Sequence, residues 1–438
     1  MKRVLILTYY WPPSGGAGVQ RWLKFVKHLR RFNWEPVVVT PTNPERPYED
    51  PSLTKDIPAD TQIITIHIKE PYTWYKRFTG KQKGETFQHG FLREKKQKSP
   101  GLKEKLSVWI RGNIFIPDAR VLWVRPTTKF LSKYLQAHPV DLIVSTGPPH
   151  SVHLIAKALK RKHKTAWIAD FRDPWTGIYY FDKLMLTCIT KRIHHRLERS
   201  VLNNADHIVV VGNTMKHDFQ QITVRPITVI TNGYDQEDFE KVSLQRPDKF
   251  RMAYTGMFLP DQNPPELWQA LSELIQEHED FGKWFELLLV GKTDQSILQQ
   301  IHKTGLGEHT HIQDYVPHSD LPYVWEKAAV LLLSINRIPN AAYILTGKVF
   351  EYLGSGRPIL AICPESGDIA GIIKETKTGI VVPFNQKERL KDSILKLFTD
   401  YKHQKSTLHS IAITKYSRLS LTQQMAEVFD EVTTHSNA

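Results

Sequence analysis

The sequence predicts an α/β protein built from doubly wound parallel sheets. Two patterns lead to this class. Short apolar runs recur along all 438 residues, and most are apolar at successive positions, as is typical of strands buried on both faces of a parallel sheet. The segments between the runs carry helical spacing, so strand and helix alternate. A chain of this length contains about two or three domains.

Thirteen runs are expected to form strands. In the first half of the chain they are Val4–Tyr10, Pro36–Thr40, Ile63–Ile68, Asp141–Thr146, Thr165–Phe171, His207–Gly212 and Ile227–Gly233. In the second half they are Arg251–Met257, Phe285–Gly291, His311–Val316, Val330–Ile335, Pro358–Cys363 and Gly379–Pro383. These are too many strands for one sheet, so the pattern indicates two sheets.

Helices are expected between the strands. In each half the first helix has an apolar face, marked by Val19, Leu23, Val26 and Leu29 and by Leu267, Leu271 and Leu274. The charged and polar segment 236–250 is the natural place to divide the chain. We therefore expect two Rossmann-like domains, residues 1–236 and 250–410. A helical segment at 411–438 should pack back toward the N-terminal domain.

The composition excludes several classes of protein. With 41% hydrophobic and 24% charged residues the chain is neither disordered nor fibrous. Two distant cysteines, Cys188 and Cys363, exclude a disulfide framework and a cysteine-based zinc site, and fit a reducing cytoplasm. No apolar run approaches the roughly 18 residues of a membrane helix. The apolar start runs into Trp11 and two prolines, so we interpret it as a buried strand and not as a signal peptide.

The formal net charge of +14 favours anionic partners. Much of the excess lies in residues 76–111, where eleven Lys or Arg stand against three Glu and aromatic residues are interleaved. Such a segment fits an insertion that contacts an anionic membrane surface, with the protein cytoplasmic and peripheral at the inner face. A solvated loop and nucleic-acid contact are the alternatives.

A glycine-rich turn follows the first expected strand. Gly15, Gly16 and Gly18 stand between strand and helix, where backbone amides can approach an anion at the helix N-terminus. The spacing resembles a dinucleotide fingerprint, but Arg21 replaces its third glycine. A turn that merely requires glycine is the alternative.

The second half of the chain holds a more specific group of candidate binding residues, just before the apolar run at 358–363. Thr346 is a candidate N-cap, so free amides near Gly347 and Lys348 would lie at a helix start. These amides and the Lys348 ammonium suit a diphosphate. Glu351 lies one turn further along the same face, placed to accept hydrogen bonds from vicinal hydroxyls. A surface Lys–Glu pair on an amphipathic helix is the alternative.

Together, several segments resemble glycosyltransferases of the GT-B fold, and the chain is most similar to glycosyltransferase family 4. The resemblance covers nearly the whole length. Its carriers are YYWPPSGGAGVQR at 9–21, DLIVSTGPP at 141–149, ADFRDPW at 169–175, RLERSVLNNADHIVVVGN at 196–213, VITNGYD at 229–235, AYTGMF at 253–258 and GKVFEYLGSGRPIL at 347–360.

The resemblance implies two domains facing a central cleft, with a nucleotide diphosphate-sugar donor bound mostly on the C-terminal domain. Family members retain the anomeric configuration and need no metal, so neither a metal nor a separate cofactor is expected. The family glutamate that holds the ribose hydroxyls matches Glu351. The amides that face the diphosphate match Tyr343 to Lys348, including Thr346 and Gly347.

The resemblance also places the glycine-rich first loop, with Gly16 and Gly18, close to donor phosphate and acceptor. Gly256, at the end of the first strand of the C-terminal domain, is expected among the donor-binding residues.

Three departures from the family pattern stand out. Tyr343 occupies the place of a first motif glutamate, eight residues before Glu351. The usual Arg and Lys pair after the first C-domain strand is missing, so Lys348 is our candidate for neutralising the diphosphate, with Arg337 and Lys292 as alternatives. A family histidine at the end of an N-domain strand has no match, and the segment 170–173 occupies its place.

Candidate catalytic and acceptor-binding residues follow from that segment. Asp170 and Asp173 stand at a strand end, where open α/β sheets bind ligands, and either could orient the acceptor or accept its proton. A structural cluster with Arg172 is the alternative. Arg172, Trp175 and His150 are candidate acceptor contacts, although a histidine at the place of His150 could instead serve the start of a helix.

The predicted function is a retaining glycosyltransferase in cell-surface polysaccharide synthesis. It would move a sugar from a nucleotide-diphosphate donor, with UDP favoured over GDP, to a glycan or lipid-linked acceptor. A GT-B type sugar-nucleotide epimerase is the enzymatic alternative. A nicotinamide-dependent oxidoreductase is disfavoured by the broken glycine fingerprint. A non-enzymatic nucleic-acid-binding protein would rest on charge alone, so no nucleic acid is expected as a partner.

Overall fold

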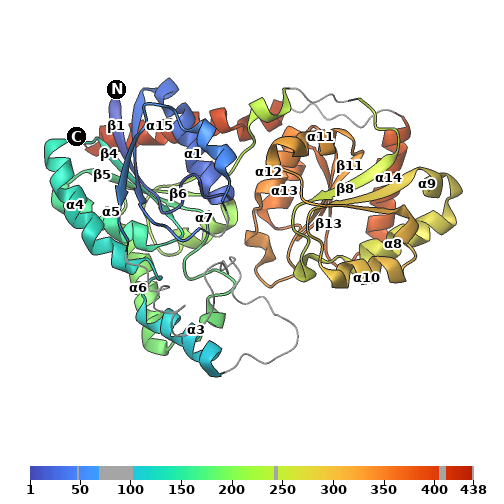
Figure 1. The fold of residues 1–438 in the computed structure, drawn as a ribbon, viewed down its shortest axis with the longest axis horizontal. Coiled ribbons are helices and arrows are strands. Elements are labelled where there is room, and N and C mark those ends of the chain that lie inside the picture. The colour runs from blue at the N-terminus through green and yellow to red at the C-terminus, as the bar shows by residue number, and fades with distance from the viewer. Residues whose placement is uncertain (47–48, 69–101, 241–244, 404–410, 437–438) are drawn as a thin grey trace. The chain divides into compact units, whose positions relative to one another are not determined.

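The computed structural model describes residues 1–438 except 47–48, 69–101, 241–244, 404–410 and 437–438 (Figure 1). Within it the chain forms two compact units. The first comprises Met1–Thr231 and Leu421–Ala438, and the second comprises Asn232–Ser420. Most of the basic segment 76–111 lies outside the described residues, and the prediction of membrane contact falls there.

A seven-stranded parallel sheet forms the centre of the first unit, in the order β3-β2-β1-β4-β5-β6-β7. Its strands are β1 (Lys2–Leu7), β2 (Trp34–Pro41), β3 (Gln62–Ile66), β4 (Leu142–Gly147), β5 (Ala166–Phe171), β6 (His207–Val210) and β7 (Ile227–Val229). Its helices are α1 (Ala17–Leu29), α3 (Leu102–Ile114), α4 (Val124–Ala137), α5 (Ser151–His163), α6 (Cys188–Asn204), α7 (Asn213–Gln220) and α15 (Arg418–Ser436).

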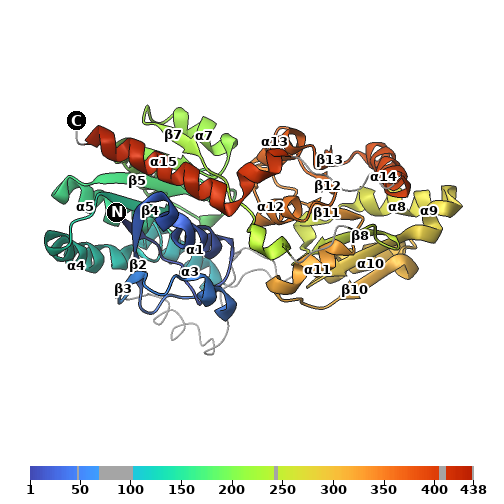
Figure 2. The ribbon, with the colours of Figure 1, turned by 90° about the horizontal axis from the view of Figure 1, so that it is seen from above.

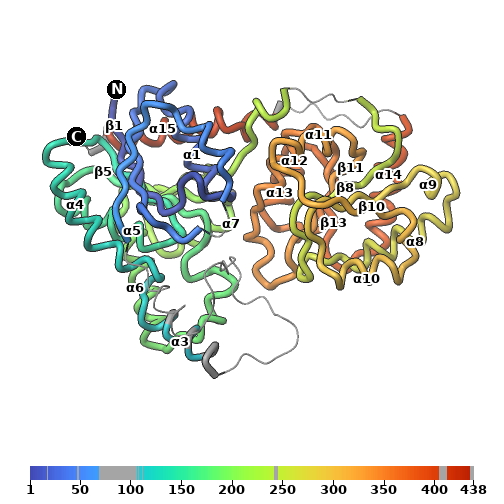
Figure 3. The backbone as a smooth tube through the Cα atoms, in the orientation of Figure 1, coloured from blue at the N-terminus to red at the C-terminus, as the bar shows by residue number. Residues whose placement is uncertain are grey.

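Apolar periodicity places α1 and α15 on this sheet. The predicted face of α1 is fully buried together with Trp22, in a cluster that also contains residues of β1, β2 and β4. Residues Leu421, Met425 and Phe429 of α15 join the same cluster. The Phe429 ring meets Trp34 edge to face at 5.2 Å between centroids. The C-terminal helix therefore completes the first unit, and Figure 3 shows it passing beside β1 and α1.

Six parallel strands form the sheet of the second unit, in the order β10-β9-β8-β11-β12-β13. They are β8 (Phe250–Thr255), β9 (Phe285–Val290), β10 (Thr310–Gln313), β11 (Val330–Ser334), β12 (Ile359–Ile362) and β13 (Gly379–Val382). The helices are α8 (Pro265–Glu277), α9 (Glu279–Trp284), α10 (Gln295–Lys303), α11 (Leu321–Glu326), α12 (Gly347–Gly354), α13 (Asp368–Thr376) and α14 (Lys387–Lys402).

Two apolar clusters cover the two faces of this second sheet. One contains residues of α8, α9, α10 and α14, including the predicted Leu267, Leu271 and Leu274, all fully buried. The other contains residues of α11, α12 and α13. Figure 2 shows this arrangement from above. Apolar side chains of β8 lie in both clusters, with Met252 in the first and Ala253 in the second.

The predicted α/β class with two parallel sheets is confirmed, and each of the thirteen predicted runs overlaps a strand. The boundaries differ. The first unit ends at Thr231, before the charged segment 236–250, and the last helix begins at Arg418. Most strands also end earlier than predicted, as β1 does at Leu7, because the residues that follow turn away into loops at the carboxyl edge, whereas β2 and β4 each end one residue later. In both sheets the strand order reverses at the first strand of the unit, and open α/β sheets bind ligands beyond such a point.

Candidate functional site

The start of α12 lies beyond the reversal point of the second sheet. Thr346 is the N-cap of this helix, and its hydroxyl accepts a hydrogen bond from the Lys348 amide at 3.4 Å. Within the described residues the N–H groups of Thr346 and Gly347 donate no hydrogen bond, as expected for the first turn of a helix. Amides in this position, together with the helix dipole, favour an anion.

Lys348 extends from α12 to the end of β8. Its ammonium donates to the Tyr254 hydroxyl at 2.7 Å and lies 4.0 Å from the centre of that ring. A Cβ built on Gly256 would lie 3.2 Å from the Lys348 Nζ, so glycine at 256 leaves room for the ammonium. Burial lowers the pKa of Lys348 to about 7, although the nearby Glu351 carboxylate acts in the opposite direction. The amine therefore changes charge near neutral pH.

Glu351 follows one turn later and is held by a histidine. The Glu351 Oε1 and the His318 Nε2 are 3.0 Å apart, and both side chains are partly exposed. His318 was not among the predicted site residues. It lies 33 residues away in sequence and begins a short 3-10 turn, so no local pattern links the two. The contact fixes the direction of a carboxylate that keeps its second oxygen available.

Arg337 was the alternative cation for this site. Its guanidinium is paired with the carboxylate of Glu266 and also donates to Asn385 at 3.1 Å. Its backbone amide donates to Asp261 at 2.8 Å. Because this charge is already balanced within the second unit, Lys348 is the better source of positive charge for a ligand.

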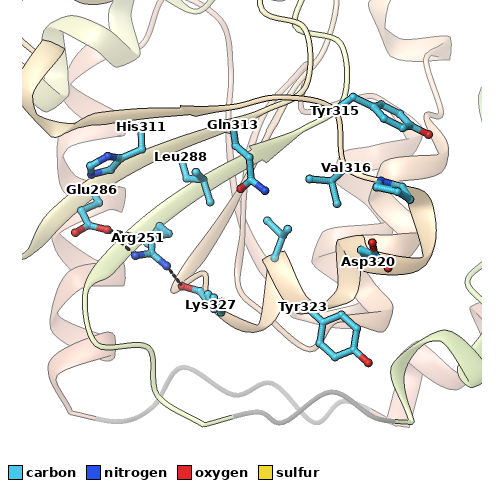
Figure 4. Close-up of a pocket in the computed structure, with 12 residues that line it drawn as sticks. Arg251, Glu286, Leu288, His311, Gln313, Tyr315, Val316, Asp320, Tyr323 and Lys327 are labelled. Atoms are coloured by element: carbon cyan, nitrogen blue, oxygen red, sulfur yellow. Dashed lines mark hydrogen bonds and ion pairs between the residues drawn. The ribbon is translucent and has the colours of Figure 1, made fainter.

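A groove of about 660 Å³ lies over β8, β9 and β10, beside α11 (Figure 4). One end holds Arg251, ion-paired with Glu286 at 2.8 Å. The other end holds Tyr315, Val316 and Tyr323. Pro317 also lines this end and directly precedes His318, the residue that contacts the Glu351 carboxylate.

The glycine-rich loop of the first unit has a structural reason for its glycines. Gly16 precedes α1 with a φ of 111°, in the region that favours glycine. A Cβ on Gly18 would lie 1.7 Å from the Arg172 guanidinium. Arg172 in turn donates to the Gly147 carbonyl at 3.2 Å and to the Pro148 carbonyl. Arg172 therefore joins the two loops, and this use competes with its predicted role as an acceptor contact.

Asp170 is fully buried beneath these loops. Its carboxylate is paired with Arg21 at 2.8 Å and accepts hydrogen bonds from the Trp22 indole at 2.8 Å and the Thr146 hydroxyl at 2.7 Å. Burial acts to raise the pKa of Asp170, but Arg21 and the hydrogen bonds outweigh burial and lower it. A carboxylate with these partners holds the fold together and leaves no oxygen for an acceptor, so we withdraw it as a catalytic candidate.

Asp173 is different, because it is exposed at the carboxyl edge of the first sheet. No hydrogen bond or ion pair to its carboxylate is present in the described chain. Of the two aspartates predicted from the sequence, the structure therefore leaves Asp173 as the one that a substrate can reach.

His150 and Trp175 pack against each other. Their rings stack at 4.6 Å between centroids with an angle of 5°. Trp175 is only 3% exposed, and its indole donates to His194 at 3.1 Å. This leaves no face of Trp175 for a sugar ring, contrary to our expectation. His150 is the N-cap of α5 and is partly exposed, which matches the structural alternative stated for it.

Within the described ranges, no three His, Cys, Asp or Glu side chains gather in a way that could hold a metal ion. No described helix is both long and apolar enough to span a bilayer.

Two family models match the chain. The model of glycosyl transferases group 1 matches residues 235–409, and that of glycosyltransferase family 4 matches residues 90–238. Among curated proteins, none matches this sequence.

Solved structures are similar over nearly the whole length. WaaG, a glycosyltransferase involved in lipopolysaccharide biosynthesis, is 14% identical, with 97% of this chain and 99% of that chain covered and a TM-score of 0.56. A trehalose-6-phosphate protein from E. coli bound with UDP-2-fluoro glucose is 10% identical, with coverages of 99% and 97% and a TM-score of 0.56. A putative UDP-N-acetylglucosamine 2-epimerase from Listeria monocytogenes is 13% identical, with coverages of 98% and 97% and a TM-score of 0.54.

This chain is a glycosyltransferase with the GT-B fold, as its two parallel sheets, the two family models and the similar solved structures show. The chain is an enzyme of the group 1 type that resembles glycosyltransferase family 4, as its motifs predicted.

Replacing Asp170 by asparagine should destabilise the first unit without a specific effect on chemistry. The change leaves the buried Arg21 guanidinium without its counter-charge, and breaking a buried pair costs about 3–5 kcal/mol. Urea unfolding of Asp170→Asn measures this loss. The control is Asp182→Asn, which removes the exposed pair with Lys191 and should cost about 1 kcal/mol or less. A stable but inactive Asp170→Asn protein would instead restore a catalytic role.

Acidification should weaken the first unit through its buried histidines. Burial lowers the pKa of His153 to about 3, whereas the pKa of histidine in an unfolded chain is about 6.5. The unfolded chain thus binds the proton first, and stability should fall as pH drops below about 6.5. His153→Asn should reduce that slope by up to about 1.4 kcal/mol per pH unit between pH 7.5 and 5. Urea unfolding across this range checks it; identical slopes in both proteins would contradict the assignment.

Proposed function

We propose that this glycosyltransferase is a retaining enzyme that binds a nucleotide diphosphate-sugar on its second unit and transfers the sugar to an acceptor bound on its first. One observation carries the proposal. The capped start of α12 presents unused amides, the Lys348 ammonium and the histidine-held Glu351 carboxylate at the reversal point of the second sheet. These groups complement a diphosphate followed by vicinal hydroxyls.

Each donor-binding residue then has a role. The Thr346 and Gly347 amides and the Lys348 ammonium stabilise the diphosphate as it leaves, which is where preorganised donors lower the barrier most. Glu351 accepts hydrogen bonds from the ribose hydroxyls. The base would lie toward Val316 at the adjoining end of the groove (Figure 4). UDP is the favoured nucleotide, supported by the E. coli relative bound with UDP-2-fluoro glucose, and GDP is second.

Asp173 is the proposed acceptor-side residue. It orients the acceptor hydroxyl or accepts its proton while the bond between the sugar anomeric carbon and the β-phosphate oxygen breaks. A new bond from the acceptor oxygen forms on the same face of the sugar. The acceptor is a glycan or a lipid-linked sugar in cell-surface polysaccharide synthesis. We place the protein at the cytoplasmic membrane face through residues 76–111.

A sugar-nucleotide epimerase of the GT-B type is the second candidate, because the Listeria epimerase shares the fold to a similar extent. The two differ in their need for an acceptor. An epimerase releases nucleotide and altered sugar from the donor alone, whereas a transferase should turn over slowly until an acceptor hydroxyl is supplied.

Replacing Glu351 by glutamine should weaken UDP binding by about 10–100-fold, because a hydrogen bond to a charged group contributes about 1.5–3 kcal/mol. Calorimetric titration with UDP and with 2′-deoxy-UDP measures the effect. Wild-type protein should prefer UDP, and Glu351→Gln should lose most of that preference. The matched control, Glu388→Gln, changes an exposed glutamate and should bind both nucleotides as wild type does. Equal affinity of Glu351→Gln and wild type for UDP would refute the assignment.

UDP affinity should decrease as pH rises through about 7, because a diphosphate binds the protonated form of Lys348 and the free protein loses that proton near this pH. Above pH 7 the dissociation constant should rise by up to about tenfold per pH unit. Titrations in buffers of different ionisation enthalpy should also detect proton uptake on binding. In Lys348→Met both effects should vanish. A pH dependence that persists in the variant would assign the titration to another group.

A further inference from the structure

We infer that the first unit carries a second anion site, separate from the donor site, in a groove between α4 and α5 that binds phosphate groups. The groove has a volume of about 540 Å³, within the range of roughly 300–1,000 Å³ that ligand pockets occupy. The two helices lie side by side in both ribbon views (Figures 1 and 2).

Four cations line this groove: Arg125 and Lys129 from α4, and Arg161 and Lys162 from α5. The first two stand one helical turn apart, so they share a face, and no carboxylate is among the lining residues. All four side chains are exposed. Like charges gathered in this way repel one another, and the repulsion is relieved by a bound anion.

None of these four cations has a counter-charge within the described fold. In the described chain no ion pair or hydrogen bond involves the side chain of any of the four. Some other cations of this unit are neutralised within the fold, as Lys24 is by Asp56 at 2.7 Å and Arg30 by Glu35 at 2.7 Å. Lys160, adjacent to Arg161, is paired with Asp206. Four unpaired cations therefore lie together in one groove where the two helices meet.

The types of cation in the groove indicate the ligand. Two of the four cations are arginines, whose planar guanidinium matches phosphate in bidentate fashion. The ligand chemistry is thus a phosphate or diphosphate group, from a lipid headgroup or from a free phosphate compound.

The test compares two full-length variants that lose the same charge. The groove variant is Arg125→Gln, Lys129→Gln, Arg161→Gln and Lys162→Gln. The control variant changes four exposed cations away from the groove: Lys55→Gln, Lys183→Gln, Arg192→Gln and Arg196→Gln. Thermal melts establish that both fold. The groove variant should melt no lower than wild type, because repulsion is removed and no ion pair is lost.

One arm measures inorganic pyrophosphate binding by calorimetry, in a Lys348→Met background so that the donor site does not contribute. The other measures flotation with vesicles of phosphatidylglycerol and phosphatidylcholine, against phosphatidylcholine alone. The groove variant should lose binding by roughly tenfold or more in at least one arm, since each basic residue near an anionic surface contributes substantially. The control should stay within about twofold of wild type.

The arm in which the groove variant loses binding identifies the source of the phosphate group. Loss with vesicles alone assigns a lipid headgroup, and loss with pyrophosphate alone assigns a free phosphate compound. The pair Arg125→Lys and Arg161→Lys, which keeps charge but removes the guanidinium geometry, should weaken binding partially. Equal losses in groove and control variants, or no loss in either arm, would overturn the inference.

Discussion

The carboxyl edge of the first sheet depends on one buried ion pair, between Arg21 of α1 and Asp170 of β5. Neither side chain is exposed to water, so the desolvation of two charges must be offset within the protein. Further hydrogen bonds to both side chains offset this cost. Trp22 and Thr146 also donate to the carboxylate, and another Arg21 nitrogen donates to the Thr231 carbonyl at 2.7 Å. One pair thus ties α1 to the ends of β4, β5 and β7.

This pair sets the position of the loops above it. Because Arg21 holds α1 against β5, the glycine-rich loop that begins α1 is brought beside Arg172, two residues beyond Asp170. With Arg172 in this position a side chain at 18 would meet its guanidinium, and that guanidinium binds the carbonyls of the Gly-Pro-Pro turn after β4. Asp173, next in sequence, is left at the exposed edge. The glycine motif that resembles a phosphate loop therefore also serves packing, because it leaves room for the Arg172 side chain.

In the described part of the second unit, one partly buried cation has no carboxylate partner. Arg337 is neutralised by Glu266, whereas Lys348 is held by a tyrosine hydroxyl and ring and has no carboxylate within ion-pair distance in the described chain. Burial without a counter-ion makes its charge responsive to a ligand, because an arriving anion supplies the missing partner. The same distinction separates the α4–α5 groove from the paired cations around it. We therefore expect these units to receive an anion where unpaired cations lie together in a groove or beside the start of a helix.

The sequence by itself determined the two parallel sheets, the strands, the helical faces and the donor-side motif, because each is a local pattern of apolar spacing or capping that neighbouring residues enforce. It also predicted that Lys348 and Glu351 share a face, which helical geometry alone requires. Tertiary structure decided which of two nearby aspartates is reachable, since burial of Asp170 depends on Arg21, distant by 149 positions. It likewise decided that Trp175 packs against His150, that His318 holds Glu351, and that four cations of α4 and α5 converge. These outcomes arise from contacts between segments far apart in sequence, and a local pattern contains no information about which partner will neutralise a charge or cover a ring.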